Sequence, residues 1–165
     1  MQRIYLSRVW SIEMGVEYTI RKMVSRDIDQ VLEVENLSFP NPWSRGTFEV
    51  ELQENLFAHY FVVVQDETIV GYAGMWMILD EAHVTNIAIH PDFRGLRFGK
   101  KLVCELIVQA FKLGGKQITL EVRVSNLIAQ KLYKDLGFYE AGIRKGYYSD
   151  NNEDAIVMWK DIGIN

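Results

Sequence analysis

The segment from Asn86 to Leu102 offers the most chemistry in this 165-residue chain. A short apolar run, Ile87–Ile89, leads into the loop Arg94-Gly-Leu-Arg-Phe-Gly-Lys100, and helix-forming residues continue from about Gly99 to Lys112. A strand, a basic glycine-containing loop and a helix start together supply unpaired backbone N–H groups and a positive dipole end. This arrangement suits a phosphate or pyrophosphate, although ordinary strand–turn–helix connections share the pattern.

Composition narrows the class of protein. Hydrophobic residues make up 48% of the chain and charged residues 24%, which is typical of a compact soluble domain. The net charge of −4 argues against nonspecific nucleic-acid binding as the main activity. No apolar run approaches the roughly 20 residues of a membrane span, so we expect no membrane association. Cys104 is the single cysteine, which excludes internal disulfides and a cysteine-based zinc site and favours a cytoplasmic location. We expect no metal ligands elsewhere.

Periodicity and turn residues predict one domain over residues 16–165, preceded by a short extension, residues 1–15, that does not read as a signal peptide. The predicted strands are 17–23, 60–64, 69–79, 82–90, 117–124, 138–148 and 155–160, and the predicted helices are 25–38, 44–54, 99–112 and 126–136. Hairpins and crossover helices alternate in this order, which predicts an α/β or α+β domain on a mixed sheet. Gly71 and Gly74 within one strand indicate a bulge or a close backbone approach.

Two motifs resemble the GNAT superfamily of acetyl-CoA-dependent N-acetyltransferases. Arg94-Gly-Leu-Arg-Phe-Gly99 is similar to the family's pyrophosphate loop, Arg/Gln-x-x-Gly-x-Gly/Ala. The more specific match is Asn126-Leu-Ile-Ala-Gln-Lys-Leu-Tyr-Lys-Asp-Leu-Gly-Phe138, which resembles Asn-x-x-Ala-x-x-Leu-Tyr-x-x-x-Gly-Phe. The resemblance implies a mixed, mostly antiparallel central sheet of about seven strands flanked by about four helices, with acetyl-CoA as the acetyl donor and CoA as product.

Three further segments narrow the resemblance to RimI-type and related archaeal protein N-terminal acetyltransferases. They are Leu120-Glu-Val-Arg-Val-Ser-Asn126, Phe39-Pro-Asn-Pro-Trp-Ser44, and Gly146-Tyr-Tyr148 followed by Glu153-Asp-Ala155. The resemblance implies transfer of an acetyl group to the N-terminal α-amine of a protein, with ribosomal proteins or broader nascent-chain N-termini as substrates. We expect a monomer or a weak homodimer.

The resemblance also assigns the cofactor contacts. The backbone of Ile87, Ala88 and Ile89 would pair with the pantetheine arm, and Asn126 would also contact that arm, although an N-cap role explains Asn126 equally well. The pyrophosphate would lie on Arg94, Gly95, Leu96, Arg97, Phe98, Gly99 and Lys100. Arg97 departs from the family pattern, which has glycine there. Two outcomes are open for Arg97: it adopts the backbone conformation of a glycine and adds a positive charge, or it weakens CoA binding. Its side chain points either to the phosphates or into solvent.

Direct acetyl transfer requires a neutral amine, and Glu121 is the residue that we assign as general base, acting through water. An α-amino group has a pKa of about 7.7–8.0, so a carboxylate needs to help only modestly. Spacing alone favours a structural role, in which Glu121 lies on the surface and pairs with Arg123 on the same strand face. The resemblance instead favours Glu121 as the general base. Tyr133 is assigned as general acid toward the CoA sulfur by the resemblance, against an alternative role in the core. His83 is a secondary catalytic candidate, and a half-exposed strand histidine is its alternative.

Two aromatic segments would form the walls of the acceptor site. Phe39, Pro40 and Trp43 would lie on one side, and Tyr147 and Tyr148 on the other. The alternative for Trp43 and Phe39 is a hydrophobic staple around the following helix, and the two roles are compatible. Two other functions stay open: acetylation of lysine side chains or small amines, and CoA binding without catalysis in a partner subunit.

Overall fold

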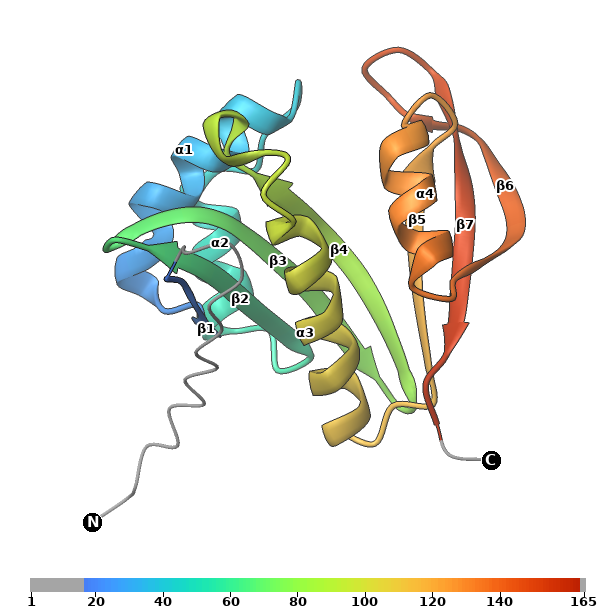
Figure 1. Cartoon of the computed structure of the whole chain (residues 1–165), viewed down its shortest axis with the longest axis horizontal. Helices are drawn as coiled ribbons and strands as arrows, with labels where there is room; N and C mark the ends of the chain where they lie inside the picture. Colours follow the sequence, from blue (N-terminus) through green and yellow to red (C-terminus); the bar gives the residue numbers. More distant parts are fainter. Residues whose placement is uncertain (1–16, 164–165) are drawn as a thin grey trace. The chain divides into compact units, whose positions relative to one another are not determined.

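The structure, a computed structural model, describes residues 17–163, so the predicted extension over residues 1–15 lies outside the described residues (Figure 1). The strands are β1 (Thr19–Lys22), β2 (Ala58–Gln65), β3 (Thr68–Ile78), β4 (Glu81–Ile89), β5 (Gln117–Arg123), β6 (Tyr139–Tyr148) and β7 (Glu153–Asp161). The α-helices are α1 (Ile28–Ser38), α2 (Arg45–Gln53), α3 (Phe98–Lys112) and α4 (Leu127–Asp135). Short 3-10 turns, η1 (Ser25–Asp27) and η2 (Pro91–Phe93), precede α1 and follow β4.

The strands form one seven-stranded sheet in the order β1-β2-β3-β4-β5-β7-β6. β4 and β5 pair in parallel at their first residues, with Glu81 opposite Gln117 and His83 opposite Thr119. The β1–β2, β5–β7 and β6–β7 pairs are antiparallel. The mixed, mostly antiparallel sheet with its helices confirms the fold class that the sequence predicts.

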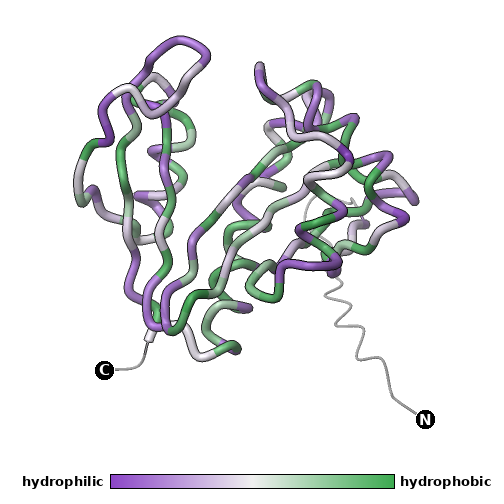
Figure 2. Tube along the Cα trace, turned by 180° about the vertical axis from the view of Figure 1, so that it is seen from behind, coloured by the Kyte–Doolittle hydropathy of each residue, from purple (hydrophilic) through white to green (hydrophobic). Residues whose placement is uncertain are grey.

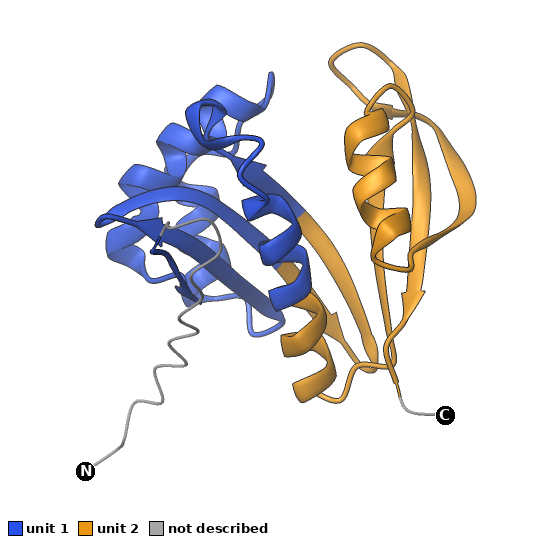
Figure 3. Ribbon diagram, viewed as in Figure 1, with its two compact units in different colours: residues 1–74, 86–105 blue, residues 75–85, 106–165 orange. Residues whose placement is uncertain are grey.

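Contacts divide the chain into two compact units (Figure 3). Unit 1 holds the described residues up to Gly74 together with Asn86–Glu105, and unit 2 holds Met75–Thr85 and the described residues from Leu106 onward.

The core of unit 1 lies under α1 and α2. Ile28, Val31 and Val34 of α1 and Phe48 of α2 pack on Tyr60, Val62, Tyr72 and Ala88 of the strands. The neighbouring residues Phe61 and Val63 are also buried, so β2 is covered on both faces. Hydrophobic and hydrophilic residues alternate in short stretches along much of the chain (Figure 2). Leu102 of α3 packs beside Gly71 of β3, which places α3 on the face opposite Tyr72.

In unit 2, β5 carries an apolar face and a polar face. Ile118, Leu120 and Val122 are buried, together with Met158 of the neighbouring β7. The intervening residues Thr119, Glu121 and Arg123 point to the other face, because side chains alternate along a strand. The antiparallel register places Glu121 opposite Val157. The candidate base therefore lies on a strand held in place by seven consecutive pairs with β7.

The two strand glycines are sites of close approach, as predicted. A Cβ at Gly71 would lie 2.9 Å from the carbonyl oxygen of Ala88. A Cβ at Gly74 would lie 2.1 Å from the ring of Tyr60. A side chain at either position would displace β4 or a core aromatic ring.

Substitution Gly74→Ala should lower the free energy of unfolding by about 1–3 kcal/mol, because the added methyl overpacks against the Tyr60 ring. Gly142→Ala is the matched control, since no atom lies within 4 Å of a Cβ there. Its effect should stay within about 1 kcal/mol of zero or be stabilising. Urea unfolding of both variants provides the comparison. Equal stability of the two variants would contradict the close packing at Gly74.

Candidate functional site

The loop between β4 and α3 turns through two left-handed residues. Arg97 has a φ of +63°, and Gly95 has a φ of +81°. The departure at Arg97 therefore changes the side chain while the left-handed, glycine-like backbone is kept. Phe98 anchors the start of α3, since it is 2% exposed and its ring contacts Tyr18 edge-on at 5.6 Å.

Positive side chains surround this helix start. Arg94, Arg97 and Lys100 are all exposed to solvent. Arg94 is partly fixed, because its Nε donates to the carbonyl of Ile89 at 3.1 Å. Exposed cations beside free helix N–H groups provide a site for an anion such as a pyrophosphate.

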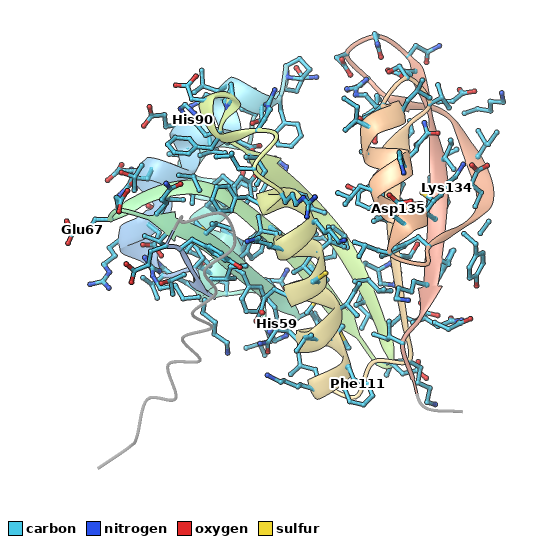
Figure 4. All side chains as sticks on the ribbon, in the orientation of Figure 1. His59, Glu67, His90, Phe111, Lys134 and Asp135 are labelled. Carbon is cyan, nitrogen blue, oxygen red and sulfur yellow. The ribbon has the colours of Figure 1, made fainter. Side chains whose placement is uncertain are left out.

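The strand that leads into the loop carries Ile87, Ala88 and Ile89. Ala88 is 5% exposed and belongs to the core of unit 1, whereas Ile87 and Ile89 are partly exposed. After the strand, the His90 amide donates to Val70 at 2.8 Å, and His90 Nδ1 accepts from the Asp92 amide at 3.2 Å (Figure 4). His90 therefore shapes the turn at the end of β4.

The segment Phe39–Ser44 is fixed at its C-terminal end. Ser44 caps α2, because its Oγ accepts from the Thr47 amide at 3.2 Å. Trp43 precedes the cap and packs its ring on Phe48 at 5.5 Å, which is a hydrophobic staple. The staple alternative is thus confirmed for Trp43. Phe39 also packs against the core, whereas Pro40 is exposed.

A buried carboxylate that the sequence analysis missed lies beneath this segment. Glu35 of α1 is 1% exposed, and its Oε1 accepts from the Trp43 amide at 2.8 Å. Its Oε2 accepts from the hydroxyl of the fully buried Tyr72. Burial raises the pKa of Glu35, and the two hydrogen bonds oppose that rise only in part. The available signal was spacing: Glu35 follows Ile28 by seven residues and Val31 by four, on the apolar face of α1.

In unit 2, Glu121 forms an ion pair with a partner other than the predicted one. Its Oε1 lies 3.1 Å from Nε of Arg144 on β6, and its side chain is 20% exposed. Arg123, the predicted alternative partner, instead pairs with Asp150 at 2.8 Å and Glu153 at 3.0 Å. Glu121 is therefore partly exposed and paired with one exposed cation, whereas Arg123 holds the turn between β6 and β7.

The two tyrosines of β6 lie on the side of Glu121. Their rings meet edge-on at 5.1 Å, with Tyr147 49% exposed. Burial raises the pKa of Tyr147, and the nearby charge of Glu121 raises it further. Tyr148 packs under the Arg123 guanidinium, whose Cζ lies 3.8 Å from the ring centroid. The structure thus brings Glu121, Tyr147 and Tyr148 together within unit 2.

Tyr133 lies on α4 and is 8% exposed, with its ring 5.8 Å from that of Phe138. Burial, with a smaller contribution from Tyr148, raises the pKa of Tyr133 to about 12. The phenol is therefore protonated at neutral pH and has a proton to donate. Asn126 is exposed and caps α4, because its Oδ1 accepts from the Ala129 amide at 3.1 Å. The capping role of Asn126 is confirmed.

His83 is half-exposed on β4, with Nε2 3.2 Å from Oε2 of Glu81 and its ring 6.2 Å from that of Trp159. It pairs with Thr119, and Thr119 shares a face with Glu121, so His83 and Glu121 lie on the same face of unit 2. The half-exposed position of His83 on the strand agrees with the alternative to a catalytic role.

The predicted residues thus fall into two sets. Unit 1 holds the basic loop, Ile87–Ile89 and the segment Phe39–Ser44, and unit 2 holds Glu121, Tyr133, Asn126, His83 and the two tyrosines. Among residues 17–163, no group of three His, Cys, Asp or Glu side chains could hold a metal ion. No helix within that range is long and apolar enough to span a membrane.

A comparison with protein-family models decides the family. The model described as Acetyltransferase (GNAT) family matches residues 28–138, which is more than half of the chain. The chain belongs to the GNAT acetyltransferase family.

Relatives of this acetyltransferase carry a common name. The Escherichia coli K12 ribosomal protein bS18-alanine N-acetyltransferase is 37% identical over 142 residues, covering 85% of this chain and 95% of its own. A Bacillus subtilis protein, to which the same name is assigned provisionally, is 44% identical over 149 residues. The match covers 90% of this chain and 99% of that protein. The crystal structure of the ribosomal-protein-S18-alanine N-acetyltransferase from Escherichia coli superposes with a TM-score of 0.82 at 35% identity, covering 90% of this chain and 96% of that one.

The left-handed backbone at Arg97 of this acetyltransferase can be tested by stability. Arg97→Gly should be more stable than Arg97→Ala by about 1 kcal/mol, because only glycine adopts a positive φ without steric cost. Chemical denaturation measures the difference. Leu96 is the matched control, since its φ is not positive. There the order should reverse, with Leu96→Ala more stable than Leu96→Gly. An alanine variant at position 97 as stable as the glycine variant would contradict the assigned backbone.

Proposed function

We propose that this acetyltransferase transfers the acetyl group of acetyl-CoA to the N-terminal α-amine of a protein, with the alanine N-terminus of ribosomal protein bS18 as the first substrate to test. The observation that carries the proposal is the accessible carboxylate of Glu121 beside Tyr147 and Tyr148. The names of the relatives in Escherichia coli and Bacillus subtilis support the choice of acceptor.

Acetyl-CoA fits the residues of unit 1. The left-handed turns at Gly95 and Arg97 leave backbone N–H groups at the start of α3, and Arg94, Arg97 and Lys100 supply positive charge. These groups would hold the pyrophosphate, with Arg97 adding a charge where the family has none. Ile87, Ala88 and Ile89 would pair with the pantetheine arm. Bound acetyl-CoA supplies an activated thioester carbonyl to the attacking amine.

Glu121 would make the amine nucleophilic. At neutral pH most α-amines are protonated, since their pKa is about 7.7–8.0. A water held by Glu121 would accept the ammonium proton and pass it to the carboxylate. Arg144 pairs with this carboxylate and would move aside, or share it, when the cationic N-terminus arrives. His83 on the same face is a second proton acceptor. Phe39, Pro40, Trp43, Tyr147 and Tyr148 would contact the first residues of the acceptor.

The neutral amine would then attack the thioester carbonyl carbon. A C–N bond forms and the C–S bond breaks. The nitrogen gives up its surplus proton to solvent water, and the departing thiolate takes up a proton. Tyr133 would donate it from its phenol hydroxyl, because a phenol is protonated at neutral pH. Asn126, at the cap of the same helix, would contact the CoA arm. No covalent enzyme intermediate is needed, so no nucleophilic triad is required.

The acceptor class can be decided with peptides. Purified protein and acetyl-CoA should acetylate a peptide that begins with the bS18 N-terminus, and tandem mass spectrometry should place the group on the α-nitrogen. A peptide with a blocked α-amine and a free lysine, and small amines such as a polyamine, should react at least tenfold more slowly. Exclusive modification of lysine or small amines would replace the proposal with that acceptor class. Binding of acetyl-CoA without turnover of any amine would indicate a non-catalytic subunit.

The assigned base and acid make a second prediction. Glu121→Gln and Tyr133→Phe should each lower kcat by about 10²–10⁴-fold, the range for loss of a proton-transfer group. The Glu121→Gln defect should shrink above about pH 8, because the α-amine is then already neutral. The Tyr133→Phe defect should persist there.

Matched controls come from the same unit. Glu140 pairs with Lys134 at 2.7 Å, and Tyr139 is 48% exposed, so Glu140→Gln and Tyr139→Phe change equivalent groups elsewhere on the surface. Both controls should keep kcat within twofold of the unsubstituted protein. Full activity in Glu121→Gln and Tyr133→Phe would remove these residues from the mechanism.

A further inference from the structure

Two glutamates are buried in unit 1, and both accept a hydrogen bond from a tyrosine. Glu35 is 1% exposed and Glu51 is 8% exposed. Tyr60 donates to Glu51 at 3.0 Å, and Tyr72 donates to Glu35. A buried carboxylate costs stability unless its oxygens are hydrogen-bonded, and removing one donor leaves that cost uncompensated. Such a group is retained where its hydrogen bonds fix something in place.

The two carboxylates differ in what they hold. The second donor to Glu51 is the side-chain amide of Asn55 at 3.1 Å, one turn farther along the chain. The second donor to Glu35 is the backbone amide of Trp43 at 2.8 Å. Glu35 therefore reaches across eight residues and binds the main chain of the segment Phe39–Ser44. In the proposed function this segment is one wall of the acceptor site, and it is called the acceptor loop below.

The connection continues to β4. Tyr72 is fully buried on β3, and the side-chain amide of Asn86 interacts with its hydroxyl. Asn86 Oδ1 is itself buried without a hydrogen-bond partner among the described residues. Asn86 immediately precedes Ile87–Ile89, the strand residues assigned to the pantetheine arm. A buried polar chain of Trp43, Glu35, Tyr72 and Asn86 thus joins the acceptor loop to the cofactor-binding strand within unit 1.

We propose that Glu35 is a positioning residue for the acceptor: it holds the main chain of Trp43, and through Tyr72 it fixes the acceptor loop relative to β4. The inference rests on the proposed function for its consequence in catalysis. The staple between Trp43 and Phe48 orients the side chain, and Glu35 fixes the backbone that carries it. Loss of this bond loosens a wall of the acceptor site and leaves the basic loop, Glu121 and Tyr133 unchanged.

The test is Glu35→Gln, which keeps the size of the side chain but offers one acceptor oxygen in place of two. Either Trp43 or Tyr72 then loses its acceptor. The KM for the peptide should rise about tenfold, as expected from loss of one hydrogen bond to a charged group. The KM for acetyl-CoA and kcat should change less than threefold. Glu51→Gln is the matched control, and it should lower thermal stability without raising the KM for the peptide.

Amide hydrogen exchange separates this inference from the proposed function, because it needs no peptide substrate. In the free protein, the fragment that contains Trp43 should exchange about tenfold faster in Glu35→Gln than in Glu51→Gln. If no peptide is acetylated by the unsubstituted protein, the proposed function fails, and faster exchange still supports the anchoring of the loop. Unchanged exchange and an unchanged peptide KM in Glu35→Gln would overturn the inference. Should Glu35→Gln not fold, Tyr72→Phe removes one donor to the same carboxylate and should shift both readouts in the same direction.

Discussion

Burial of Phe98 against Tyr18 fixes where α3 begins, and this contact determines what the preceding loop can do. With Phe98 anchored, the chain turns through a positive φ at Arg97 and at Gly95 before it enters the helix. Backbone N–H groups and three exposed cations are thereby left at one helix end. The helix start is thus fixed by a packed aromatic ring, while the charged side chains of the loop face solvent.

Three glutamates show how environment gives one residue type different tasks. Glu35 is enclosed, so burial raises its pKa and its oxygens are used to hold the main chain of Trp43. Glu51 is also enclosed and holds Tyr60. Glu121 is partly exposed and faces Arg144, and in the proposed function it is the group that would exchange a proton with an arriving amine. Accessibility, more than residue type, separates the structural carboxylates from the candidate base.

Much of this architecture was predictable from short-range signals. The strands and helices follow hydrophobic periodicity, and Ser44 and Asn126 cap their helices as local spacing indicates. The strand, turn and helix start around Arg94–Lys100 were predictable because their signals are contiguous in the sequence, and the anion site there stays a prediction. Two backbone conformations were open for Arg97, because the identity of a residue does not by itself fix its φ angle.

Long-range pairing was harder to predict. The partner of Glu121 is Arg144, 23 positions along the chain on β6, and spacing favoured Arg123 because only local neighbours are visible in a sequence. The role of Glu35 depends on Tyr72, a residue on a different strand, and on the main chain of Trp43, so only its place on an apolar helix face hinted at it. A contact between segments that are distant in the sequence can be identified only once the fold is known.

The most direct test of the account is a crystal structure with CoA and an alanine-initiated peptide bound. We predict that the pyrophosphate lies on the amides of residues 95–99 and that the pantetheine arm follows Ile87–Ile89. We also predict that a water bridges the peptide α-nitrogen to Glu121. A peptide bound with its α-nitrogen beyond the reach of such a water, or a pyrophosphate bound away from this loop, would contradict it.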